Sequence, residues 1–228
     1  MSYPDEEIVI KKGNELQAED FGDLTTILIE NPKPEKRTGI HLADEELIRG
    51  SVPMTKEEVR TVSIAKLKLT KNAVIYDVGA GTGSVSIEAA LQGENLRVYA
   101  IEKNPEGAEL IRKNMQKFRT DQIQVIEGVA PEALEALEMP THAFIGGSSG
   151  NLKEIVKLLL EKNSHVRIVI NCITLETVSE ALETAKEFGF EENEIVQLSA
   201  ARSKAIGRYH MMMGENPIYI ITLQNPGK

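Results

Sequence analysis

The sequence has few cysteines, few aromatic residues and no long apolar run. Its 228 residues include one cysteine, Cys172, no tryptophan, and 4% aromatic residues in all. One cysteine excludes an internal disulfide and fits a reducing compartment. Scarce aromatic rings leave few platforms for stacking RNA bases. No apolar run approaches the roughly 18 residues of a membrane-spanning helix, and no signal peptide opens the chain, so we expect a soluble, cytoplasmic protein without membrane contact.

An excess of positive charge is also missing, since the formal net charge is −9. Binding nucleic acid in general requires a basic surface to contact phosphates, so we expect no nucleic-acid partner. The chain has no Cys/His cluster at metal-ligand spacing, no G-x-S-x-G elbow and no P-loop, and we predict no metal site. The length suits one α/β domain of about 180 residues with an extension.

The most informative stretch is Ile75 to Gly83, IYDVGAGTG, which joins a predicted strand over 73–78 to a helix from Ser84. A strand that ends in a Gly-rich turn at a helix N-terminus lets backbone N–H groups approach a ligand closely. The next predicted strand, 97–101, runs into Glu102, and an acid in that place accepts hydrogen bonds from ribose hydroxyls. The pattern predicts a pocket for a nucleoside-bearing cofactor.

The glycine spacing favours S-adenosylmethionine over a dinucleotide. Dinucleotide folds prefer G-x-G-x-x-G, with the third glycine inside the helix. Here the pattern is G-x-G-x-G, and Ser84 stands where a dinucleotide fold would have its third glycine. S-adenosylmethionine has no pyrophosphate to seat on the helix, and Asp77 at the strand end could face its cationic sulfonium and amino group. The alternatives are a nicotinamide oxidoreductase and a plain tight turn beside a surface glutamate.

From Thr55 onward, strands and helices alternate, which implies a mostly parallel sheet covered on both faces. Thr55 and Glu58 have the spacing of a capping box for the first helix. The last two strands have no helix between them and should pair antiparallel, with a long loop over 201–216. The expected strands are 73–78, 97–101, 122–126, 141–145, 165–171, 194–200 and 217–223, and the expected helices are 55–67, one from 84, 105–118, 131–137, 152–160 and 175–188.

This order of elements predicts an α/β class I S-adenosylmethionine-dependent methyltransferase fold. That fold is Rossmann-like, with a mostly parallel seven-stranded sheet and an antiparallel edge strand. Residues 1–54 do not follow the alternation: 7–11 and 25–30 are expected to be short strands, and the prolines and charges of 31–36 are typical of a linker. We therefore divide the chain into an N-terminal extension, 1–36, and a methyltransferase domain, 37–228.

Four segments together resemble one family. They are GSVPMTKEEVR (50–60), DVGAGTGSVSIE (77–88), IGGS (145–148) and NCITLET (171–177). Over about residues 39–222 the chain resembles the decarboxylating precorrin and cobalt-precorrin methyltransferases of cobalamin biosynthesis, which form the C-terminal domain of precorrin-6Y methyltransferases. The glycine turn occurs in many methyltransferases, whereas the other three segments are much more specific.

The resemblance implies methylation of carbon 15 of a corrin precursor by S-adenosylmethionine, with S-adenosylhomocysteine as product. It also implies decarboxylation of the acetate side chain on carbon 12, and a homo-oligomer, a tetramer. Residues 3–8 and 24–30 resemble the end of a tetrapyrrole methylase domain that precedes this domain in many relatives. The alternative is an ordinary N-terminal extension.

For the cofactor, the resemblance assigns the glycine loop, the end of the second strand and the turn after the third. Where the family usually has Gly-Asp-Ala-Pro, this chain has Gly-Val-Ala-Pro at 128–131, so a carboxylate that could accept from the adenine amino group is missing. The loss corresponds to one hydrogen bond, about 1 kcal/mol. The predicted cofactor residues are Thr55, Asp77, Gly79, Ala80, Gly81, Thr82, Gly83, Glu102, Gly128, Val129, Ala130 and Gly146.

A corrin precursor carries many carboxylates, so an acidic protein needs a local basic patch to bind it. The predicted loop 201–216 offers one, because it has no acid before Gly214, and methionines 211–213 could contact a ring system. The alternative is a solvated loop. The predicted substrate residues are Arg49, Met54, Lys56, Gly147, Ser148, Asn171, Arg202, Lys204, Arg208 and His210. No residue is identified as a catalytic base, since the histidines are isolated in the sequence.

Two other functions stay open at this point. Some tRNA methyltransferases share the predicted fold, although the negative charge, the scarcity of aromatic residues and the lack of an N-P-P-Y type motif oppose RNA as substrate. The second alternative is a binding module, a degenerate fold that binds the cofactor but catalyses no reaction. The intact glycines and Glu102 argue against it.

Overall fold

The computed structural model describes residues 8–12, 15, 26–30, 41–93, 95–190 and 192–225. The chain divides into two compact units, 1–38 and 39–228. In the first unit, the described residues 8–12 and 26–30 belong to no strand, so the short strands expected at 7–11 and 25–30 are not formed there. The predicted linker, 31–36, and residues 3–7 lie outside the described residues.

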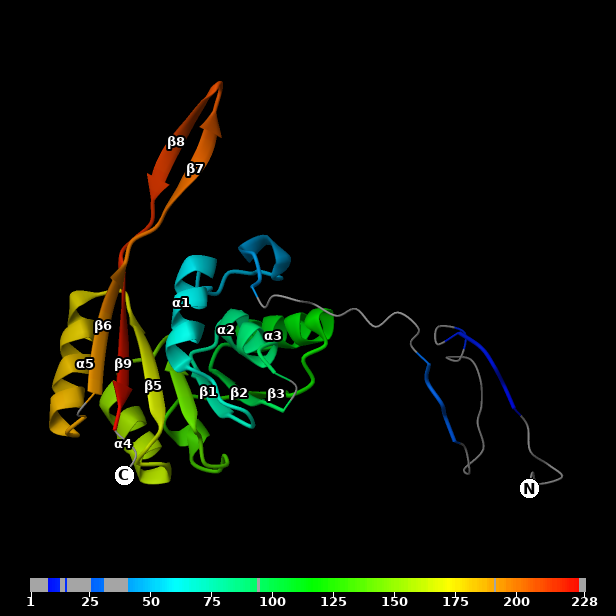
Figure 1. Ribbon diagram of the computed structural model, residues 1–228, viewed down its shortest axis with the longest axis horizontal. Coiled ribbons are helices and arrows are strands. Elements are labelled where there is room, and N and C mark those ends of the chain that lie inside the picture. Colours follow the sequence, from blue (N-terminus) through cyan, green and yellow to red (C-terminus); the bar gives the residue numbers. More distant parts are fainter. Residues whose placement is uncertain are drawn as a thin grey trace. The chain divides into compact units, whose positions relative to one another are not determined.

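The second unit is built on a seven-stranded sheet in the order β3-β2-β1-β4-β5-β9-β6 (Figure 1). Pairing is parallel from β3 to β5 and antiparallel for β5–β9 and β9–β6. In chain order the elements are η2 (Asp44–Glu46), α1 (Glu57–Leu67), β1 (Val74–Val78), α2 (Ser84–Ala90), β2 (Arg97–Glu102), α3 (Pro105–Phe118), β3 (Ile123–Glu127), η3 (Glu132–Leu134), β4 (His142–Ile145), α4 (Leu152–Lys162), β5 (Arg167–Cys172), α5 (Leu175–Glu187), β6 (Glu192–Leu198), β7 (Ala201–Ile206), β8 (Tyr209–Gly214) and β9 (Ile218–Gln224).

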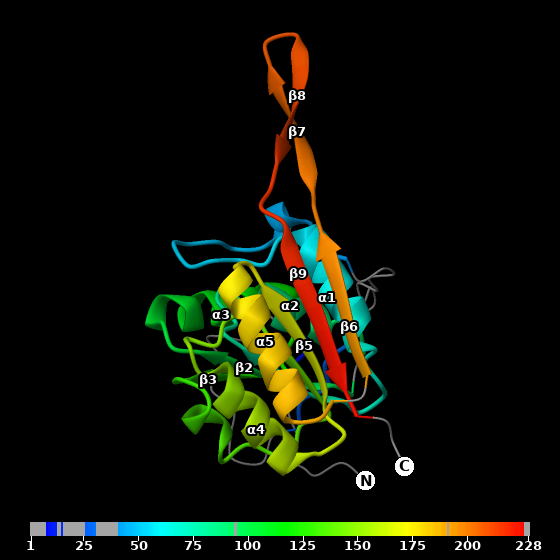
Figure 2. The ribbon, with the colours of Figure 1, turned by 90° about the vertical axis from the view of Figure 1, so that its left-hand side faces the viewer.

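The predicted methyltransferase-type α/β fold is thus confirmed, with its antiparallel edge: β9 is the antiparallel strand and β6 lies outside it. Figures 1 and 2 show α1, α2 and α3 on one face of the sheet and α4 and α5 on the other. Strand β1 is buried along its whole length because both faces are covered. Val74, Tyr76 and Val78 pack with α4 and α5, while Ile75 packs with α2 and α3.

Local chemistry sets the helix starts. Asn104 accepts a hydrogen bond from the Glu106 N–H and Pro105 opens α3, while Thr174 accepts from the Thr177 N–H at the start of α5. The capping box predicted from Thr55 is wrong, because α1 begins one residue later, after Lys56, without a side-chain cap. The helix expected over 131–137 is reduced to the short η3, since so few residues give too little cooperative stabilisation for an α-helix.

The loop expected over 201–216 is instead a β-hairpin. Strands β7 and β8 pair antiparallel from Ala201↔Gly214 to Ile206↔Tyr209, around a turn with Gly207 at φ +60°. This hairpin projects beyond the main sheet (Figures 1 and 2). The sequence shows no clear alternation here because both faces of the hairpin are largely exposed, so neither face has to be apolar.

Candidate active site

A cavity of about 280 Å³ lies at the carboxyl ends of β1, β2 and β4, where open parallel sheets bind ligands. Of the residues predicted to contact cofactor or substrate, it brings together Gly79, Gly81, Glu102, Gly128, Val129, Ala130, Gly146, Gly147 and Ser148. Its other lining residues, which were not predicted as contacts, include Val52, Pro53, Lys103, Asn104 and Ser149. Val52 and Pro53 belong to the segment 50–60 singled out in the sequence, whereas the other three are loop residues outside the four segments.

The glycine loop owes its shape to close backbone packing at two positions. Gly79 has φ +75°, and a Cβ there would lie 2.7 Å from the carbonyl oxygen of Gly147. Gly81 has φ +57°, and a Cβ there would overlap the carbonyl oxygen of Pro53. Side chains are excluded by both the left-handed backbone and the lack of space. The loop therefore presents bare backbone between the ends of β1 and β4.

Glu102 is buried at the end of β2, and its carboxylate is already hydrogen-bonded to the loop. Oε2 accepts from the Gly81 N–H at 2.7 Å, and Oε1 accepts from the Asn104 N–H at 2.7 Å. Gly107 of α3 packs beneath, because a Cβ there would lie 2.8 Å from Glu102 Cγ. Each carboxylate oxygen has a second lone pair, so Glu102 can order the loop and still accept from ribose hydroxyls.

Asp77 lies under the glycine loop and does not line the cavity. It is fully buried, its Oδ2 accepts from the Ser86 hydroxyl at 2.5 Å, and its Oδ1 has no hydrogen-bond partner. The pKa of Asp77 is raised to about 7. Burial is the main cause, the hydrogen bonds from Ser86 oppose the rise, and the charge of Glu102 adds to it. Because Asp77 is buried behind the cavity lining, it would influence a bound cofactor through the loop.

Several predicted cofactor residues support the cavity from behind rather than line it. Ala80 donates its N–H to the Ile101 carbonyl, and the Thr82 carbonyl accepts from the buried amide of Asn114. Gly83 is the N-cap of α2, at φ +77°. The Thr55 carbonyl accepts from Arg60 at 2.7 Å.

Arg202, predicted to bind a substrate carboxylate, is instead paired with acids of the protein. Its Nε and Nη2 bind the two oxygens of Glu58 at 3.0 and 2.7 Å, and Asp44, Glu57 and Glu215 lie within 3.5 to 3.8 Å of it. The hydrogen bonds to Glu58 raise the pKa of Arg202 and lower that of Glu58. Arg202 thus joins the hairpin base to α1, and its role toward a substrate stays a prediction.

The other predicted substrate residues lie on separate elements. Arg49 Nη2 and Lys56 Nζ lie 3.8 and 3.9 Å from Oδ2 of the buried Asp44. The side chain of Asn171, at the end of β5, accepts from the Ser63 hydroxyl at 3.0 Å. The partly buried Met54 packs on the core beside α2 and α3.

The remaining basic residues occupy the hairpin. Lys204 stands opposite Met211, and His210 opposite Ala205. The Arg208 guanidinium lies 5.1 Å from the centre of the Tyr209 ring. All three basic side chains are exposed, and none of them lines the cavity. The hairpin that carries them projects beyond the main sheet (Figure 2).

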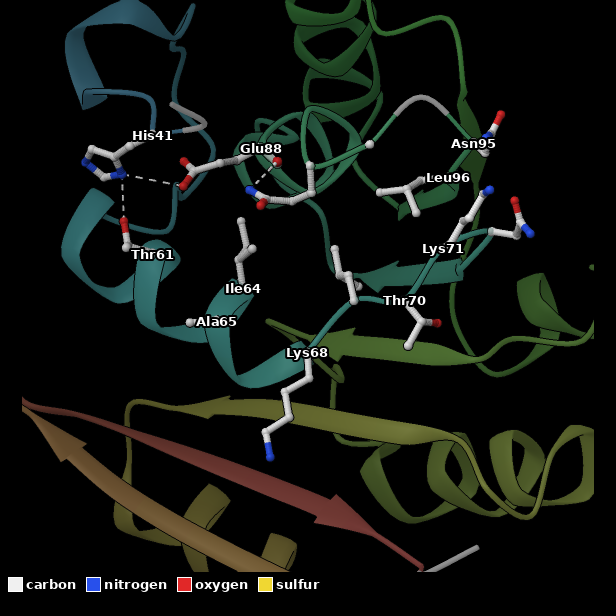
Figure 3. A pocket seen from close by; sticks show the side chains of 14 residues that line it. His41, Thr61, Ile64, Ala65, Lys68, Thr70, Lys71, Glu88, Asn95 and Leu96 are labelled. Atoms are coloured by element: carbon white, nitrogen blue, oxygen red, sulfur yellow. Dashed lines mark hydrogen bonds and ion pairs between the residues drawn. The ribbon is translucent and has the colours of Figure 1, made fainter. Parts of the chain in front are cut away.

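A larger hollow, about 760 Å³, lies between α1 and α2 and shares no lining residue with the cavity (Figure 3). His41 Nδ1 lies 2.7 Å from the Thr61 hydroxyl and 3.5 Å from Glu88 Oε1. Glu88 Oε2 also accepts a hydrogen bond from Nε of the buried Arg60 at 2.6 Å. With its buried acid neutralised in this way and no glycine loop beside it, this hollow lacks the chemistry of a nucleoside site.

Neither a metal centre nor a membrane-spanning helix is found among the described residues. Within residues 8–12, 15, 26–30, 41–93, 95–190 and 192–225, no three His, Cys, Asp or Glu side chains are arranged to hold a metal ion. No helix in the same part of the chain has the length and apolarity needed to cross a membrane.

Comparison with known proteins adds four findings. Residues 48–225 match a family described as the precorrin methyltransferase domain. A Pyrobaculum calidifontis protein named "Probable cobalt-precorrin-6B C(15)-methyltransferase (decarboxylating)" is 43% identical over 173 residues, which are 75% of this chain and 88% of that protein. A precorrin-6y C5,15-methyltransferase structure from Geobacter metallireducens has a TM-score of 0.77 at 37% identity and covers 82% of this chain and 100% of its own. A precorrin 8w decarboxylase structure from Methanobacterium thermoautotrophicum has a TM-score of 0.74 at 38% identity and covers 80% of this chain and 98% of its own.

Proposed function

The chain belongs to the precorrin methyltransferase family, and on that premise we propose that it is a decarboxylating cobalt-precorrin-6B C15-methyltransferase of cobalamin biosynthesis. It transfers a methyl group from S-adenosylmethionine to carbon 15 of the corrin precursor. The acetate side chain on carbon 12 loses its carboxylate as carbon dioxide.

The observation that carries this proposal is the meeting of the family-like segments at one cavity. Segment 50–60 supplies Val52 and Pro53, segment 77–88 supplies the glycine loop, and segment 145–148 supplies the turn after β4. Segment 171–177 begins at the carboxyl end of the neighbouring strand, β5. Stretches that are far apart in the sequence thus form one face, which a chance likeness of short motifs would not produce.

S-adenosylmethionine fits the residues at the cavity. Gly79 and Gly81 line the cavity without side chains, so their backbone can come close to a ligand there. We propose that Glu102 binds the ribose, that residues 128–130 flank the adenine, and that Gly146 borders the methionine portion. When bound, the cofactor supplies an electrophilic methyl group, and the protein holds it in line with the carbon that attacks it.

For the substrate, we propose that the exposed backbone of Gly147 and the side chain of Ser148 contact the macrocycle next to the cofactor. Arg49 and Lys56 are the basic side chains nearest in sequence to the wall residues Val52 and Pro53. Each is partly exposed, at 41% and 43% of its side chain, and so retains donors for a substrate carboxylate. No side chain is assigned to decarboxylation, for which the conjugated ring can accept the electrons.

We also propose a homotetramer. The hairpin supports this assembly, because Tyr209 and methionines 211–213 are exposed on it, and apolar side chains of this size gathered on one arm are typical of contact surfaces. Light scattering after size-exclusion chromatography would give the mass in solution. A cytoplasmic location and a fused or associated tetrapyrrole methylase domain are further proposals from the family resemblance.

The test is mass spectrometry of cobalt-precorrin-6B incubated with the protein and S-adenosylmethionine. The proposal expects a product that has gained one methyl group and lost one carbon dioxide. A methyl gain alone would move decarboxylation to another protein or domain. An unchanged substrate, with a sample that another enzyme of this family converts, would overturn the assignment and favour RNA methylation or cofactor binding without chemistry.

A further inference from the structure

The segment Ile48–Pro53, here called the strap, lies along one face of helix α3. Three α3 residues spaced by four positions, Glu106, Leu110 and Asn114, contact it in turn. Residues with this spacing share one helix face. The strap runs in the opposite direction to α3, because its first residue meets Asn114 and a later one, Ser51, meets Glu106. The pairing is therefore a continuous contact and not an isolated hydrogen bond.

The end of the strap at Asn114 is buried. The Asn114 side chain is fully buried and makes three hydrogen bonds. Its Oδ1 accepts from the Ile48 N–H at 2.8 Å, and its Nδ2 donates to the carbonyl oxygens of Ile48, at 3.1 Å, and Thr82, at 3.0 Å. One side chain thus ties the strap to the glycine loop, since Thr82 lies between Gly81 and Gly83. Removing it would leave buried backbone groups without partners.

The other end of the strap is held by exposed groups. Glu106 Oε1 accepts from the Ser51 N–H at 2.7 Å, and Oε2 accepts from the Ser51 hydroxyl at 2.5 Å. These two bonds lower the pKa of Glu106, so the carboxylate stays ionised and available as acceptor. Gly50 packs closely against α3, since a Cβ at this position would lie 2.8 Å from Leu110 Cδ1. Hydrogen bonds between exposed groups can be replaced by hydrogen bonds to water at little cost in free energy.

Beyond Ser51, the strap becomes a wall of the cavity. Val52 and Pro53 line it, and the Pro53 carbonyl packs directly against Gly81 of the glycine loop. The cavity, about 280 Å³, is at or below the lower end of the roughly 300–1,000 Å³ usual for small-molecule sites. The strap is thus a wall of the cavity whose attachment to α3 is exposed at Ser51 and Glu106 and buried at Asn114.

We propose that the strap controls entry and retention of the cofactor, with Asn114 as its fixed anchor and the Ser51–Glu106 contact as its releasable latch. Asn114 and Glu106 are thus positioning residues, which act on the cofactor through Val52, Pro53 and Thr82. This inference rests on the proposed binding of S-adenosylmethionine, and it adds which residues set the affinity and which set the rate of exchange.

The experiment measures binding and dissociation of S-adenosylhomocysteine, by calorimetry and stopped flow, for the whole chain and four variants. Glu106→Ala opens the latch and should raise both association and dissociation rates about tenfold, because two hydrogen bonds are lost. Asn114→Ala disorders the anchor and should raise Kd by 10- to 100-fold, on the order of two to three hydrogen bonds. Glu106→Gln retains an acceptor for Ser51 and should lie between Glu106→Ala and the wild type.

Glu109→Ala is the matched control, because Glu109 is an exposed acid on α3 that pairs only along the helix, with Lys113 at 3.5 Å. Its rates should equal those of the wild type. If the wild type itself fails to bind S-adenosylhomocysteine, the proposed function fails. If the wild type binds but Glu106→Ala lowers only the melting temperature and leaves both rates unchanged, the strap proposal is overturned. Hydrogen exchange of amides 48–52 gives a second readout, which should quicken in Glu106→Ala and slow when ligand binds.

Discussion

Replacing Asp77 by asparagine should change how the stability of the protein depends on pH. Asp77 is fully buried, and its pKa is raised to about 7, chiefly by burial, from an ordinary value of 3.8. The unfolded carboxyl therefore loses its proton near pH 4, whereas the folded one keeps it until about pH 7. Between these values the folded chain binds more protons than the unfolded chain, so the free energy of unfolding falls as the pH rises.

The size of the effect follows from the shift. One pKa unit corresponds to about 1.4 kcal/mol, so the full contribution from pH 4 to above pH 7 is about 4 kcal/mol. Between about pH 5 and pH 7 it is about 2 kcal/mol. Asp77→Asn cannot ionise, so the free energy of unfolding of the variant minus that of the wild type should increase by this amount over the same interval. The difference in unfolding free energy at any single pH also includes the effect of placing an amide where Asp77 Oδ1 has no partner. The test is therefore how this difference changes with pH.

The assay is urea denaturation of both proteins at several pH values, with the difference taken at each. His142 acts in the opposite sense, because burial lowers its pKa to about 4 and stability is lost as the pH falls from 6.5. Both proteins contain His142, so its contribution cancels in the difference. Ser86→Ala is a useful companion, since loss of its bond to Asp77 should move the titration to higher pH. A difference that stays constant from pH 5 to pH 7 would refute the reasoning.

Three further predictions follow from buried or crowded groups. Arg60→Met should lower the free energy of unfolding by about 3–5 kcal/mol, because it removes the buried guanidinium that binds both Asp44 and Glu88. Arg97→Met, at an exposed pair, should cost less than about 1 kcal/mol in the same urea assay. Gly81→Ala should weaken cofactor binding at least tenfold by calorimetry, since the new Cβ overlaps the Pro53 carbonyl at a left-handed position, and an unchanged Kd would show that the strap gives way freely. Val129→Asp should tighten S-adenosylmethionine binding about three- to tenfold by offering an acceptor to the adenine amino group, and an equal Kd would show that backbone groups already satisfy it.

The sequence predicted those parts of the fold and site that local patterns determine. The strand 73–78, the turn that follows and Glu102 could be found because a glycine loop demands particular residues at particular places. The cavity does form around Gly79, Gly81 and Glu102, although the contacts with a cofactor remain predictions. Helix α3 was predicted with its bounds because Pro105 and the apolar spacing mark it clearly.

The missed features depend on contacts between distant segments. Asn114 looks like an ordinary polar residue of a helix, and only the fold brings Ile48 and Thr82 to it. The capping box failed for the same reason, because Glu58 binds Arg202, which is 144 residues away, instead of the start of its own helix. No local pattern contains this information.

Arg202 also shows why a stretch of sequence without acids does not leave its basic side chains unpaired in an acidic protein. The chain has 35 acidic and 26 basic residues, so a basic side chain that lies on the body of the domain usually meets an acid. Arg202 meets Glu58 at the base of the hairpin, although no acid is near it in the sequence. Lys204 and Arg208 lie farther along the hairpin, and no ion pair joins either to an acid among the described residues. A hairpin that leaves the body of the domain thus keeps these two cations apart from the acids that pair with Arg202.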